Sequence, residues 1–464
     1  MATRAVGILA NALGDPYSLR LMQSIASELT HADTHAICFM GGFPHSPLFH
    51  DANGAPALPG NLDGWVLLSA VLPASAPELS ALARTTRACV SVGIELPEVP
   101  SLTASDEAGV FQAVAHLARR HERRRIAFIA GPPTSVDAAR RLAAYRMALE
   151  SVGLAFDPAL VASGDYEPRA GREAVRTLER QAKKYNAVVA ANDLMAIGVI
   201  DGLRASGKRV PDDVSVIGFD DMEEASFSSP SLTTVRQPLQ EVGALAARLA
   251  LQSLSGGSVE PHSAITAPLV IRESCGCRQN PSDPSERVAQ APAVNGGTHG
   301  LREGALRELV RRELSNSRIA RELGNLGEAL LGASDQPELA QPLTEACRLL
   351  KLRRFALATL SGGQRHARVT LESTGQSVVF HQQAATYALD RVLPPGYLSN
   401  DSPVQLAVAA LELAGEQFGF LLLEGDLRHT HAYLELRRTL SSALARVAQS
   451  RELRRLYTAE KKKA

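Results

Sequence analysis

The stretch from Ala187 to Asp221 reads AVVAANDLMAIGVIDGLRASGKRVPDDVSVIGFDD and decides the fold. It opens with a short apolar run, continues into a helical stretch over residues 194–204, and ends in a second apolar run over residues 214–219. Apolar strands separated by a helix indicate parallel strands that are buried on both faces. Polar residues follow each strand at once, Asn192 after the first and Asp220 after the second. Both are therefore expected at the carboxyl edge of a parallel sheet, where open α/β sheets bind their ligands.

The same pattern extends toward the N-terminus. Further apolar runs alternate with helix-like stretches and lie at residues 5–10, 36–40, 64–68, 88–92 and 126–130. This alternation predicts an α/β fold with doubly wound parallel sheets. The first 277 residues are too many for one such unit and suit two. We therefore expect two lobes, with predicted boundaries at residues 4–123 with 234–262 and residues 124–233 with 263–277.

Composition excludes several classes of protein. Of the 464 residues, 45% are hydrophobic and 21% are charged, which is typical of folded chains. The 49 basic and 49 acidic residues cancel, so whole-chain charge gives no support for binding nucleic acid by phosphate neutralisation. Apolar runs long enough to span a membrane are missing, and residues 1–15 lack the core of an export signal. Five scattered cysteines argue against a disulfide framework. We expect a cytoplasmic protein with no membrane contact.

Beyond residue 277 the composition changes. Residues 278–300 are rich in Pro, Ser, Asn and Gly and are predicted to be a flexible linker. Leucines spaced by three and four over residues 301–332 predict a helix, either a signalling and dimerisation helix or a helix packed on the next domain. Residues 333–448 combine a helix, antiparallel strands and a closing helix, as in an α+β domain. Residues 449–464 are expected to form a C-terminal helical tail.

Two strings look like nucleotide-binding motifs. Residues 202–208 read GLRASGK, but Arg209 stands where a Walker A loop needs Ser or Thr, and the string follows a helix rather than a strand. Gly207 is better explained as a helix C-cap. Residues 360–365 read LSGGQR, with no apolar strand ending in Asp-Glu close behind. The SGG of that string is expected to form a hairpin turn.

The remaining reactive residues form no recognisable catalytic set. Cys275-Gly276-Cys277 offers two thiolates, but a closed zinc site needs four ligands and no second pair stands nearby in the sequence. Plain thiols at a domain end are therefore expected. We find no nucleophile beside a base at a telling spacing. The sequence predicts no enzyme activity, no catalytic residues, no metal and no cofactor.

An ordered set of motifs resembles the effector-binding domain of the LacI/GalR repressor family, which has a type I periplasmic-binding-protein fold. The resemblance covers residues 1–277, and the motifs lie in its second half. In order they are DEAG at 106–109, RRIAFIAGP at 124–132, RLAAY at 141–145, GDY at 164–166, ANDLMAIG at 191–198, RVPDDVSVIGFDD at 209–221 and PSLTTVRQP at 230–238.

The resemblance implies a ligand site. By motif position, Arg141, Asn192 and Asp220 correspond to the polar effector contacts, Tyr166 to the aromatic stacking residue, and Tyr17 to an aromatic residue from the first loop of the other lobe. Asp accepts hydrogen bonds, Arg donates in a rigid fork and Asn does both, which suits the vicinal hydroxyls of a sugar or the edge of a base. The alternatives are structural: Arg141 as a helix-surface charge, Asn192 and Asp220 as turn formers or N-caps, and Tyr17 as a loop-packing residue.

The chain departs from the family in three places. The family begins with a helix-turn-helix and a hinge helix, whereas the first strand here starts at Ala5. Residues 41–61 form a Gly- and Pro-rich stretch in the first lobe, where the family has a helix. The family ends near residue 277, and the extension resembles a GAF domain preceded by a signalling helix. Because no kinase histidine box or GGDEF motif occurs in this sequence, the output domain is expected to be absent or to be supplied by a partner protein.

These observations predict a regulatory protein of signal transduction. A small effector, carbohydrate-like or nucleoside-like, binds between two lobes. Closure is relayed to a GAF-like module that forms a homodimer or docks a separate output protein. One alternative is a LacI-type transcription regulator acting on DNA through a partner or an unrecognised surface, since direct DNA binding is not expected. The other is an interaction scaffold that binds no ligand.

Overall fold

The computed structural model describes most of the chain, in fourteen segments. These are residues 4–10, 16–40, 49–50, 57–68, 76–86, 88–180, 184–277, 318–361, 366–374, 377–389, 391–394, 396–398, 402–414 and 416–461. The predicted linker, the first half of the predicted signalling helix and most of the Gly- and Pro-rich stretch lie outside them.

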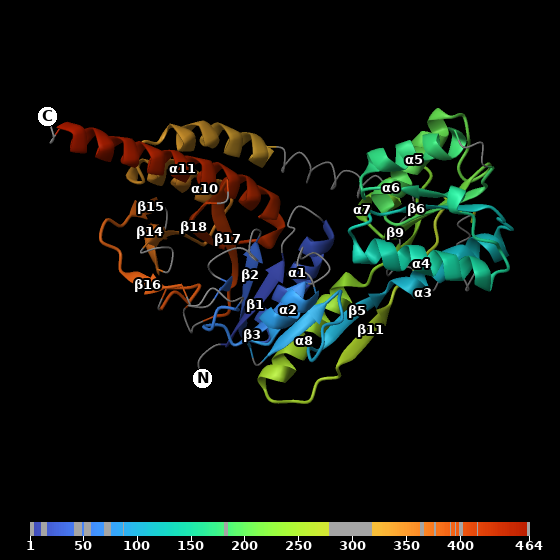
Figure 1. Ribbon diagram of the computed structural model, residues 1–464, viewed down its shortest axis with the longest axis horizontal. Coiled ribbons are helices and arrows are strands. Elements are labelled where there is room, and N and C mark those ends of the chain that lie inside the picture. Colours follow the sequence, from blue (N-terminus) through green and yellow to red (C-terminus); the bar gives the residue numbers. More distant parts are fainter. Residues whose placement is uncertain are drawn as a thin grey trace, which may run out of the picture. The chain divides into compact units, whose positions relative to one another are not determined.

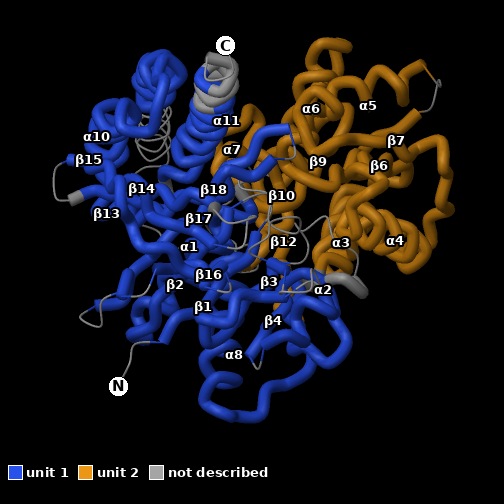
Figure 2. Tube along the Cα trace, turned by 60° about the vertical axis from the view of Figure 1, so that its left-hand side comes forward, with its two compact units in different colours: residues 1–103, 239–263, 310–464 blue, residues 104–238, 264–309 orange. Residues whose placement is uncertain are grey.

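The chain divides into two compact units, shown in different colours in Figure 2. Unit 1 comprises residues 1–103, 239–263 and 310–464, and unit 2 comprises residues 104–238 and 264–309. The first boundary lies at residue 103, whereas the sequence placed it at residue 123. The difference arises because helix α3 (Asp106–Ala115) packs on helix α4 (Val136–Ser151) of unit 2.

Unit 1 is built on a twelve-stranded sheet. Its order is β11-β5-β4-β3-β1-β2-β17-β18-β13-β14-β15, and β16 pairs with β14. The first-lobe strands are parallel from β2 to β5, as predicted. The bounds are β1 Arg4–Ala10, β2 Thr34–Met40, β3 Gly64–Leu68, β4 Cys89–Val92, β5 Ser101–Ser105, β11 His262–Thr266, β13 Arg354–Ser361, β14 His366–Thr374, β15 Ser377–Phe380, β16 Thr386–Ala388, β17 Gln405–Leu413 and β18 Glu416–Glu424.

Two groups of helices cover this sheet. In the first lobe α1 packs on α8, and the Ser24 hydroxyl of α1 donates to the Gln240 carbonyl of α8 at 2.7 Å. In the C-terminal region, α10 and α11 lie together on one side of strands β13–β18 (Figure 1). The helices of unit 1 are α1 Pro16–His31, α2 Ala76–Ala83, α8 Leu239–Leu254, residues 318–332, the 3₁₀ turns Pro337–Leu339 and Leu427–His429, α10 Ala340–Leu349 and α11 Thr430–Lys461.

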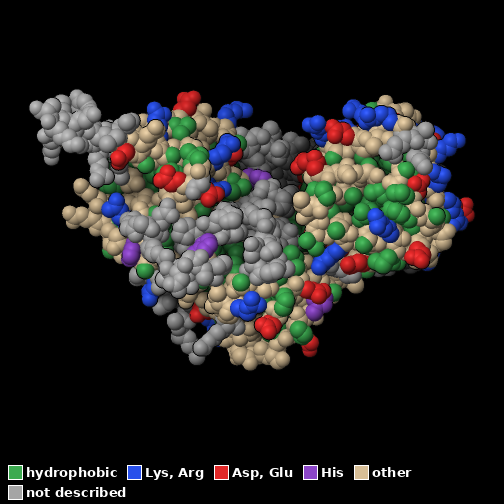
Figure 3. Space-filling model, in the orientation of Figure 1, with side chains coloured by type: hydrophobic (Ala, Val, Ile, Leu, Met, Phe, Trp, Pro, Cys, Tyr) green, Lys and Arg blue, Asp and Glu red, His purple; other side chains and the backbone are tan. Residues whose placement is uncertain are grey.

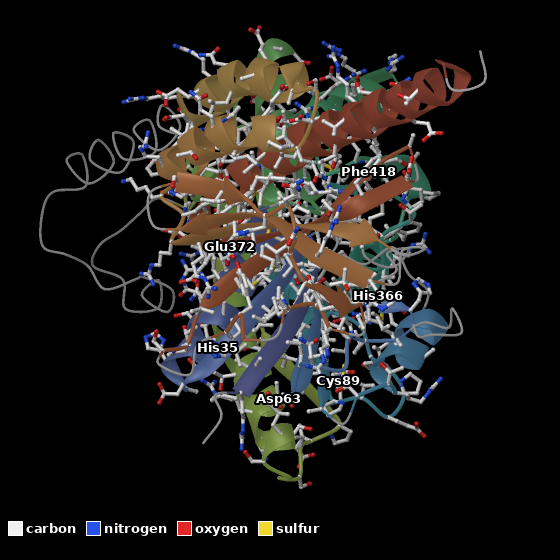
Figure 4. The ribbon with its side chains drawn as sticks, turned by 90° about the vertical axis from the view of Figure 1, so that its left-hand side faces the viewer. His35, Asp63, Cys89, His366, Glu372 and Phe418 are labelled. Atoms are coloured by element: carbon white, nitrogen blue, oxygen red, sulfur yellow. The ribbon has the colours of Figure 1, made fainter. Side chains whose placement is uncertain are left out.

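The C-terminal strands join the first lobe at one seam, because β17 pairs in parallel with β2. Val408 stands opposite Phe39 in this register, and both side chains are fully buried in one hydrophobic core. At the start of the seam His35, labelled in Figure 4, accepts a hydrogen bond through Nδ1 from the Val404 amide at 3.1 Å. The edge strand β2 is thereby covered, which removes an exposed row of unpaired backbone groups.

One face of the described half of the predicted signalling helix packs within unit 1. Residues 318–332 are helical, and Leu323 and Leu330 of the leucine stripe are buried, whereas most of the other side chains are exposed. A Cβ atom at Gly327 would lie 3.5 Å from Thr439 of α11, which is van der Waals contact. For these residues, packing on the following domain is favoured over a free dimerisation face.

Unit 2 has a six-stranded sheet of order β12-β10-β9-β8-β6-β7. Strands β6 to β10 are parallel and only β12 is antiparallel. Phe128 stacks on Tyr145 in the core, with ring centroids 4.8 Å apart, and the Tyr145 hydroxyl donates to the Ile126 carbonyl at 2.7 Å. The bounds are β6 Ile126–Ala130, β7 Val161–Ser163, β8 Ala187–Ala190, β9 Ser215–Asp220, β10 Thr233–Arg236 and β12 Leu269–Val270.

Helices flank both faces of this sheet (Figure 1). They are α3 and α4, the π-helical turn η4 His116–Arg120, the 3₁₀ turn Pro158–Leu160, α5 Pro168–Arg180, α6 Asp193–Ala205 and α7 Glu223–Phe227. Gly207 follows α6 with a φ of +75°, which confirms the predicted helix end in place of a phosphate loop. None of the helices in the described segments combines the length and apolarity needed to cross a membrane.

Candidate functional site

Five parallel strands of unit 2 end at one edge of its sheet, and the predicted site residues stand there. Asn192 follows β8, Asp220 is the last residue of β9, and Tyr166 lies three residues beyond β7. Gln237 directly follows β10. Parallel strands bring their carboxyl ends together, so these side chains share one edge.

Arg141 lies at the centre of this edge and is 4% exposed. Its Nε donates to Asp106 Oδ2 at 3.0 Å, and its Nη1 donates to the Ala191 carbonyl at 2.6 Å. Its guanidinium carbon stands 3.8 Å above the centre of the Phe219 ring. A charge this deeply buried is tolerated only with charged and hydrogen-bonding partners. The expectation that Arg141 could be a helix-surface charge is therefore wrong.

Asp220 completes a row of three charges with Arg141 and Asp106. Arg141 Nη1 lies 3.7 Å from Asp220 Oδ1, and Gln237 Nε2 donates to the same oxygen at 2.7 Å. Burial raises the pKa of Asp220 to about 6, although Arg141 and Gln237 act in the opposite direction. The backbone of Asp220 has a φ of +109°, a conformation that is strained for a residue with a side chain. Strain of this kind persists only where the surroundings fix it, which is typical of ligand sites.

Asp193 holds the loop that follows β9. It is fully buried and accepts hydrogen bonds from the Met222 amide at 2.7 Å and from Thr234 Oγ1 at 2.5 Å. Burial, together with the nearby charge of Asp220, raises the pKa of Asp193 well above its usual range. This residue positions Asp220 rather than facing the edge itself.

Asp221 anchors the same loop on its other side. Its carboxylate accepts from Arg236 Nε at 2.6 Å and from Arg272 Nη2 at 2.5 Å. Its φ is also positive, at +52°. Two consecutive residues with positive φ are thus held by ion pairs and by Asp193.

Asn192 has the structural role that the sequence left open. It is the N-cap of α6: its Oδ1 accepts from the Met195 amide at 3.0 Å. Its Nδ2 donates to the Tyr166 carbonyl at 2.9 Å. Asn192 therefore both starts α6 and fixes the loop that carries Tyr166, and its role as an effector contact stays a prediction.

Tyr166 is half-buried at the same edge. Its hydroxyl shares a hydrogen bond with Ser135 Oγ at 2.9 Å, and Ser135 also caps α4. Its ring lies against Gly131, where a Cβ atom would stand 2.5 Å from ring carbons, so only glycine fits beneath the ring. Gly131 supports one face of the ring and Ser135 holds its hydroxyl, which fixes the ring in the way that a stacking residue requires.

Tyr17 is the predicted contact that does not belong to unit 2. It stands in the first turn of α1, after β1, and belongs to unit 1. Neither unit by itself brings Tyr17 together with Arg141, Tyr166, Asn192 or Asp220, and its predicted role remains a prediction.

Sequence reasoning missed four residues of this edge: Asp106, Ser135, Asp193 and Gln237. Asp106 opens the first quoted motif, and its position at the start of a helix was visible, but its pairing with Arg141 spans 35 positions. Gln237 stands directly after a short strand that the sequence did not predict. A polar residue directly after a parallel strand was the available signal for a residue of this edge. It was applied to Asn192 and Asp220 only.

Unit 1 contains a separate cavity of about 460 Å³. Residues of both charges line it: Lys351, Arg353, Glu424 and Asp426. None of the predicted site residues borders it. It is therefore a second place where a polar molecule would fit.

The surface gives no single-sign patch on the face drawn in Figure 3. Lys and Arg side chains are interspersed there with Asp and Glu over both units. This distribution agrees with the equal numbers of basic and acidic residues.

Comparison with known proteins places this architecture. Residues 114–275 match the family model of a periplasmic binding protein-like domain. The chain is 42% identical over 152 residues to the HTH-type transcriptional regulator CelR of Thermobifida fusca, covering 32% of this chain and 45% of CelR. It is 31% identical over 278 residues to the HTH-type transcriptional repressor CytR of Escherichia coli K12, covering 59% of this chain and 79% of CytR.

A solved structure agrees with these relatives. The structure of a transcriptional regulator CelR–cellobiose complex is similar with a TM-score of 0.51 and 31% identity. The similarity covers 59% of this chain and 86% of that one. The two-lobed α/β fold expected for residues 1–277 is thereby supported. The chain spans a little under half of the length of CelR and about four fifths of CytR.

Proposed function

The chain belongs to the LacI/GalR family, and we propose that it is a regulator that binds a small polar ligand, sugar-like or nucleoside-like, at the carboxyl edge of unit 2. The ligand lies between the two lobes, and closure is relayed to the C-terminal module. The relatives are described as transcriptional regulators rather than enzymes. This agrees with the expectation that the chain catalyses no reaction.

The buried row Asp106–Arg141–Asp220 carries the proposal. Burying a charge costs several kcal/mol per ion, so apolar residues would build a more stable core at this place. The row instead stands at the sheet edge where ligands bind, beside a tyrosine ring held in place by Ser135. Alternating acceptors and donors match a molecule with neighbouring hydroxyls. Cellobiose, bound in the CelR complex, is such a molecule.

The relay is proposed to run through the β2–β17 seam. Strand β17 of the C-terminal module shares a sheet and a core with the first lobe. The chain is last described in unit 2 at residue 277 and is next described from residue 318, in unit 1. A ligand that binds the closed arrangement of the lobes more tightly than the open one shifts the chain toward closure. Because the C-terminal module is fixed to one lobe and tethered to the other, closure then acts on the module.

Three finer features belong to the proposal. The C-terminal module is taken to be GAF-like, because it has the helix, antiparallel strands and closing helix expected of that class. The active species is taken to be a homodimer, and the output is taken to be a separate protein. Gel filtration with light scattering tests the dimer: about twice the mass of one chain is expected, and the mass of a single chain would overturn it.

Transcription regulation is the second candidate. CelR and CytR are both described as HTH-type regulators, which weighs against the expectation that the chain does not act on DNA directly. A DNA complex of the pure chain that weakens with rising salt would support this role, because phosphate contacts release counterions. No complex at low salt would leave the partner-docking role as the better account.

A binding screen of the full chain tests the ligand proposal. Monosaccharides, disaccharides, nucleosides and purine bases are added, and the shift in melting temperature is followed. A ligand at about 100 times its Kd stabilises the folded chain by roughly 2.7 kcal/mol. Asp220→Asn keeps the shape of the edge but removes a charge, and is expected to lose most of the shift. Arg146→Ala, an exposed position on the same helix as Arg141, is the control and keeps it.

Two results would contradict the proposal. One is a screen without any hit on folded protein, which would favour the scaffold alternative. The other is a hit that persists unchanged in Asp220→Asn and in Gln237→Leu, which would place the ligand elsewhere.

A further inference from the structure

Four metal-binding side chains converge in unit 2, far from the ligand edge. They are His116 and His121 from the end of the α3–η4 helix and Cys275 and Cys277 from the last described segment of the unit. Their donor atoms all lie within 4.8 Å of one another. Cys275 is fully buried, and the other three are partly buried. The two cysteines are thiols, not a disulfide.

Hydrogen bonding alone does not account for this convergence. His116 Nε2 lies 3.4 Å from Cys275 Sγ, 3.5 Å from Cys277 Sγ and 3.2 Å from His121 Nε2. An imidazole nitrogen offers one proton or one lone pair, so it cannot satisfy three neighbours at once. Cys277 Sγ lies 3.4 Å from His121 Nε2 as well. The four atoms surround a common point.

The spacing matches a tetrahedral ion. With Zn–S near 2.3 Å and Zn–N near 2.05 Å, a tetrahedron places two nitrogens about 3.3 Å apart and a nitrogen and a sulfur about 3.6 Å apart. The corresponding distances here are 3.2 Å between the nitrogens and 3.4 to 3.5 Å between nitrogen and sulfur.

The local backbone explains how both pairs are aimed. His116 begins the π-helical turn and His121 is its C-cap residue. In a π-helix the hydrogen bonds run from residue i to i+5, so residues five apart return to nearly the same side. An α-helix would point these two rings in different directions.

Gly276 performs the equivalent task between the two cysteines. Its φ is +109°, and a Cβ atom there would stand 3.2 Å from His121 Nδ1. The Gly276 amide donates to the Glu273 carbonyl at 3.0 Å, and the Ser215 hydroxyl donates to the Cys275 carbonyl at 2.8 Å. The segment is thus held firmly before any metal binds.

The chemistry of the set favours zinc. Two thiolates and two imidazoles in a tetrahedral arrangement are typical ligands of Zn²⁺. Four protein ligands leave no position open, so the site would be structural rather than catalytic.

We propose that His116, His121, Cys275 and Cys277 bind one Zn²⁺ as a closed structural site. It joins residues 116–121 to residues 275–277, the end of the last described segment of unit 2. The site stands at the start of β9, near Ser215, whereas the ligand edge stands at its end, at Asp220. The zinc site is therefore independent of the proposed ligand. It also replaces the expectation of plain thiols and no metal, which considered only neighbours in sequence.

Metal analysis of the full chain is the test. The chain is purified without chelators, and its metals are measured by mass spectrometry alongside the Cys277→Ser and His121→Gln variants. Cys347→Ser, which removes a partly buried thiol in unit 1, is the matched control. We expect about one zinc per chain in the parent and in the control, and a loss of most of it in both site variants.

A second measurement guards against variants that do not fold. Cobalt replaces zinc in chelator-treated parent protein, and the visible spectrum is recorded. Tetrahedral cobalt with thiolate ligands gives intense d–d bands, and these are expected in the parent and in Cys347→Ser. The bands should be lost in His121→Gln, which retains both thiols.

Several outcomes would overturn the proposal. They are a parent with no bound metal that also gives no tetrahedral cobalt spectrum, a Cys275–Cys277 disulfide in freshly purified chain without metal, and zinc retained by both site variants. Iron or copper at one ion per chain would overturn the assignment to zinc.

Discussion

The sheets of the two units follow the same doubly wound pattern but end differently. In unit 1 the edge strand β2 is covered by β17, and the sheet grows to twelve strands. In unit 2 the sheet stays at six strands, and the polar chemistry gathers at its two ends: the Arg141 row after β9 and the Cys–His cluster before it. Under the proposed function, unit 2 therefore supplies the residues that recognise the ligand, and unit 1 carries the attached module.

The unfolding of the two units can be followed separately because unit 1 contains the chain's single tryptophan. Trp65 is the sole tryptophan and is fully buried in unit 1, with its ring centroid 4.9 Å from that of Phe39. Its emission therefore reports unfolding of unit 1. Calorimetry reports both units, and the part of the unfolding that is silent in Trp65 emission belongs to unit 2.

The largest effect is expected from Val408→Asp in β17. Val408 is fully buried opposite Phe39, so the variant buries an unpaired charge and loses apolar packing, a cost of about 5 kcal/mol or more. The melting temperature reported by Trp65 emission should fall sharply, whereas that of the calorimetric transition that Trp65 does not report should stay unchanged. Val379→Asp, at an exposed position of β15, is the control and should change stability by less than about 0.5 kcal/mol. An unchanged Trp65 transition in Val408→Asp would show that the seam does not support the first lobe.

Arg141→Ala is expected to act on the other unit. It leaves Asp106 and Asp220 without their cation, and breaking a buried pair typically costs about 3–5 kcal/mol. The melting temperature of the calorimetric transition that Trp65 does not report should fall, and the melting temperature reported by Trp65 should stay unchanged. Calorimetry and fluorescence on one sample measure both. A parallel fall of both transitions would mean that the units unfold together.

The raised pKa of Asp220 leads us to expect that the stability of unit 2 depends on pH. Its pKa is raised to about 6 from a usual value near 4, so the unfolded chain ionises first as pH rises. The stabilisation from a protonated Asp220 is complete below about pH 4 and is lost as pH rises to about 6, by up to about 3 kcal/mol. The melting temperature of the unit 2 transition should therefore decrease from pH 4 to pH 7, and Asp220→Asn should make this decrease smaller. A slope that is identical in the variant would assign the titration to other carboxyls.

Asn192→Ala gives the smallest expected effect. Loss of the N-cap of α6 costs about 1 kcal/mol, and the Tyr166 carbonyl loses its donor. Denaturant unfolding measures the first effect, and ligand affinity measures the second. Asn192→Asp keeps the cap but not the donor, so it should recover stability and leave affinity reduced. Full affinity in both variants would leave Asn192 a purely structural residue.

The sequence predicted the parallel core well because its strands are apolar throughout. Asn192 and Asp220 were placed at the sheet edge because each follows such a strand directly. Asp106 was not paired with Arg141, and His116 was not paired with Cys275, because these contacts join distant segments that periodicity does not relate.

The pairing of β2 with β17 could not be predicted from the sequence either. Strand-like runs at residues 404–412 and 417–424 predict two strands joined by a turn, yet the sheet edge that these strands extend depends on which strand elsewhere in the chain is left unpaired. Likewise, the five-residue spacing of His116 and His121 is meaningful only once η4 is known to be a π-helical turn.

Hydrogen–deuterium exchange of the full chain, with and without the strongest ligand of the screen, would show which part of the molecule binds the ligand. We expect slower exchange after the unit 2 strands, in residues 131–136, 164–167, 191–194 and 220–222, where a ligand would order the edge. Protection confined to residues 351–353 and 424–426, around the cavity of unit 1, would contradict it and place the ligand in the C-terminal module.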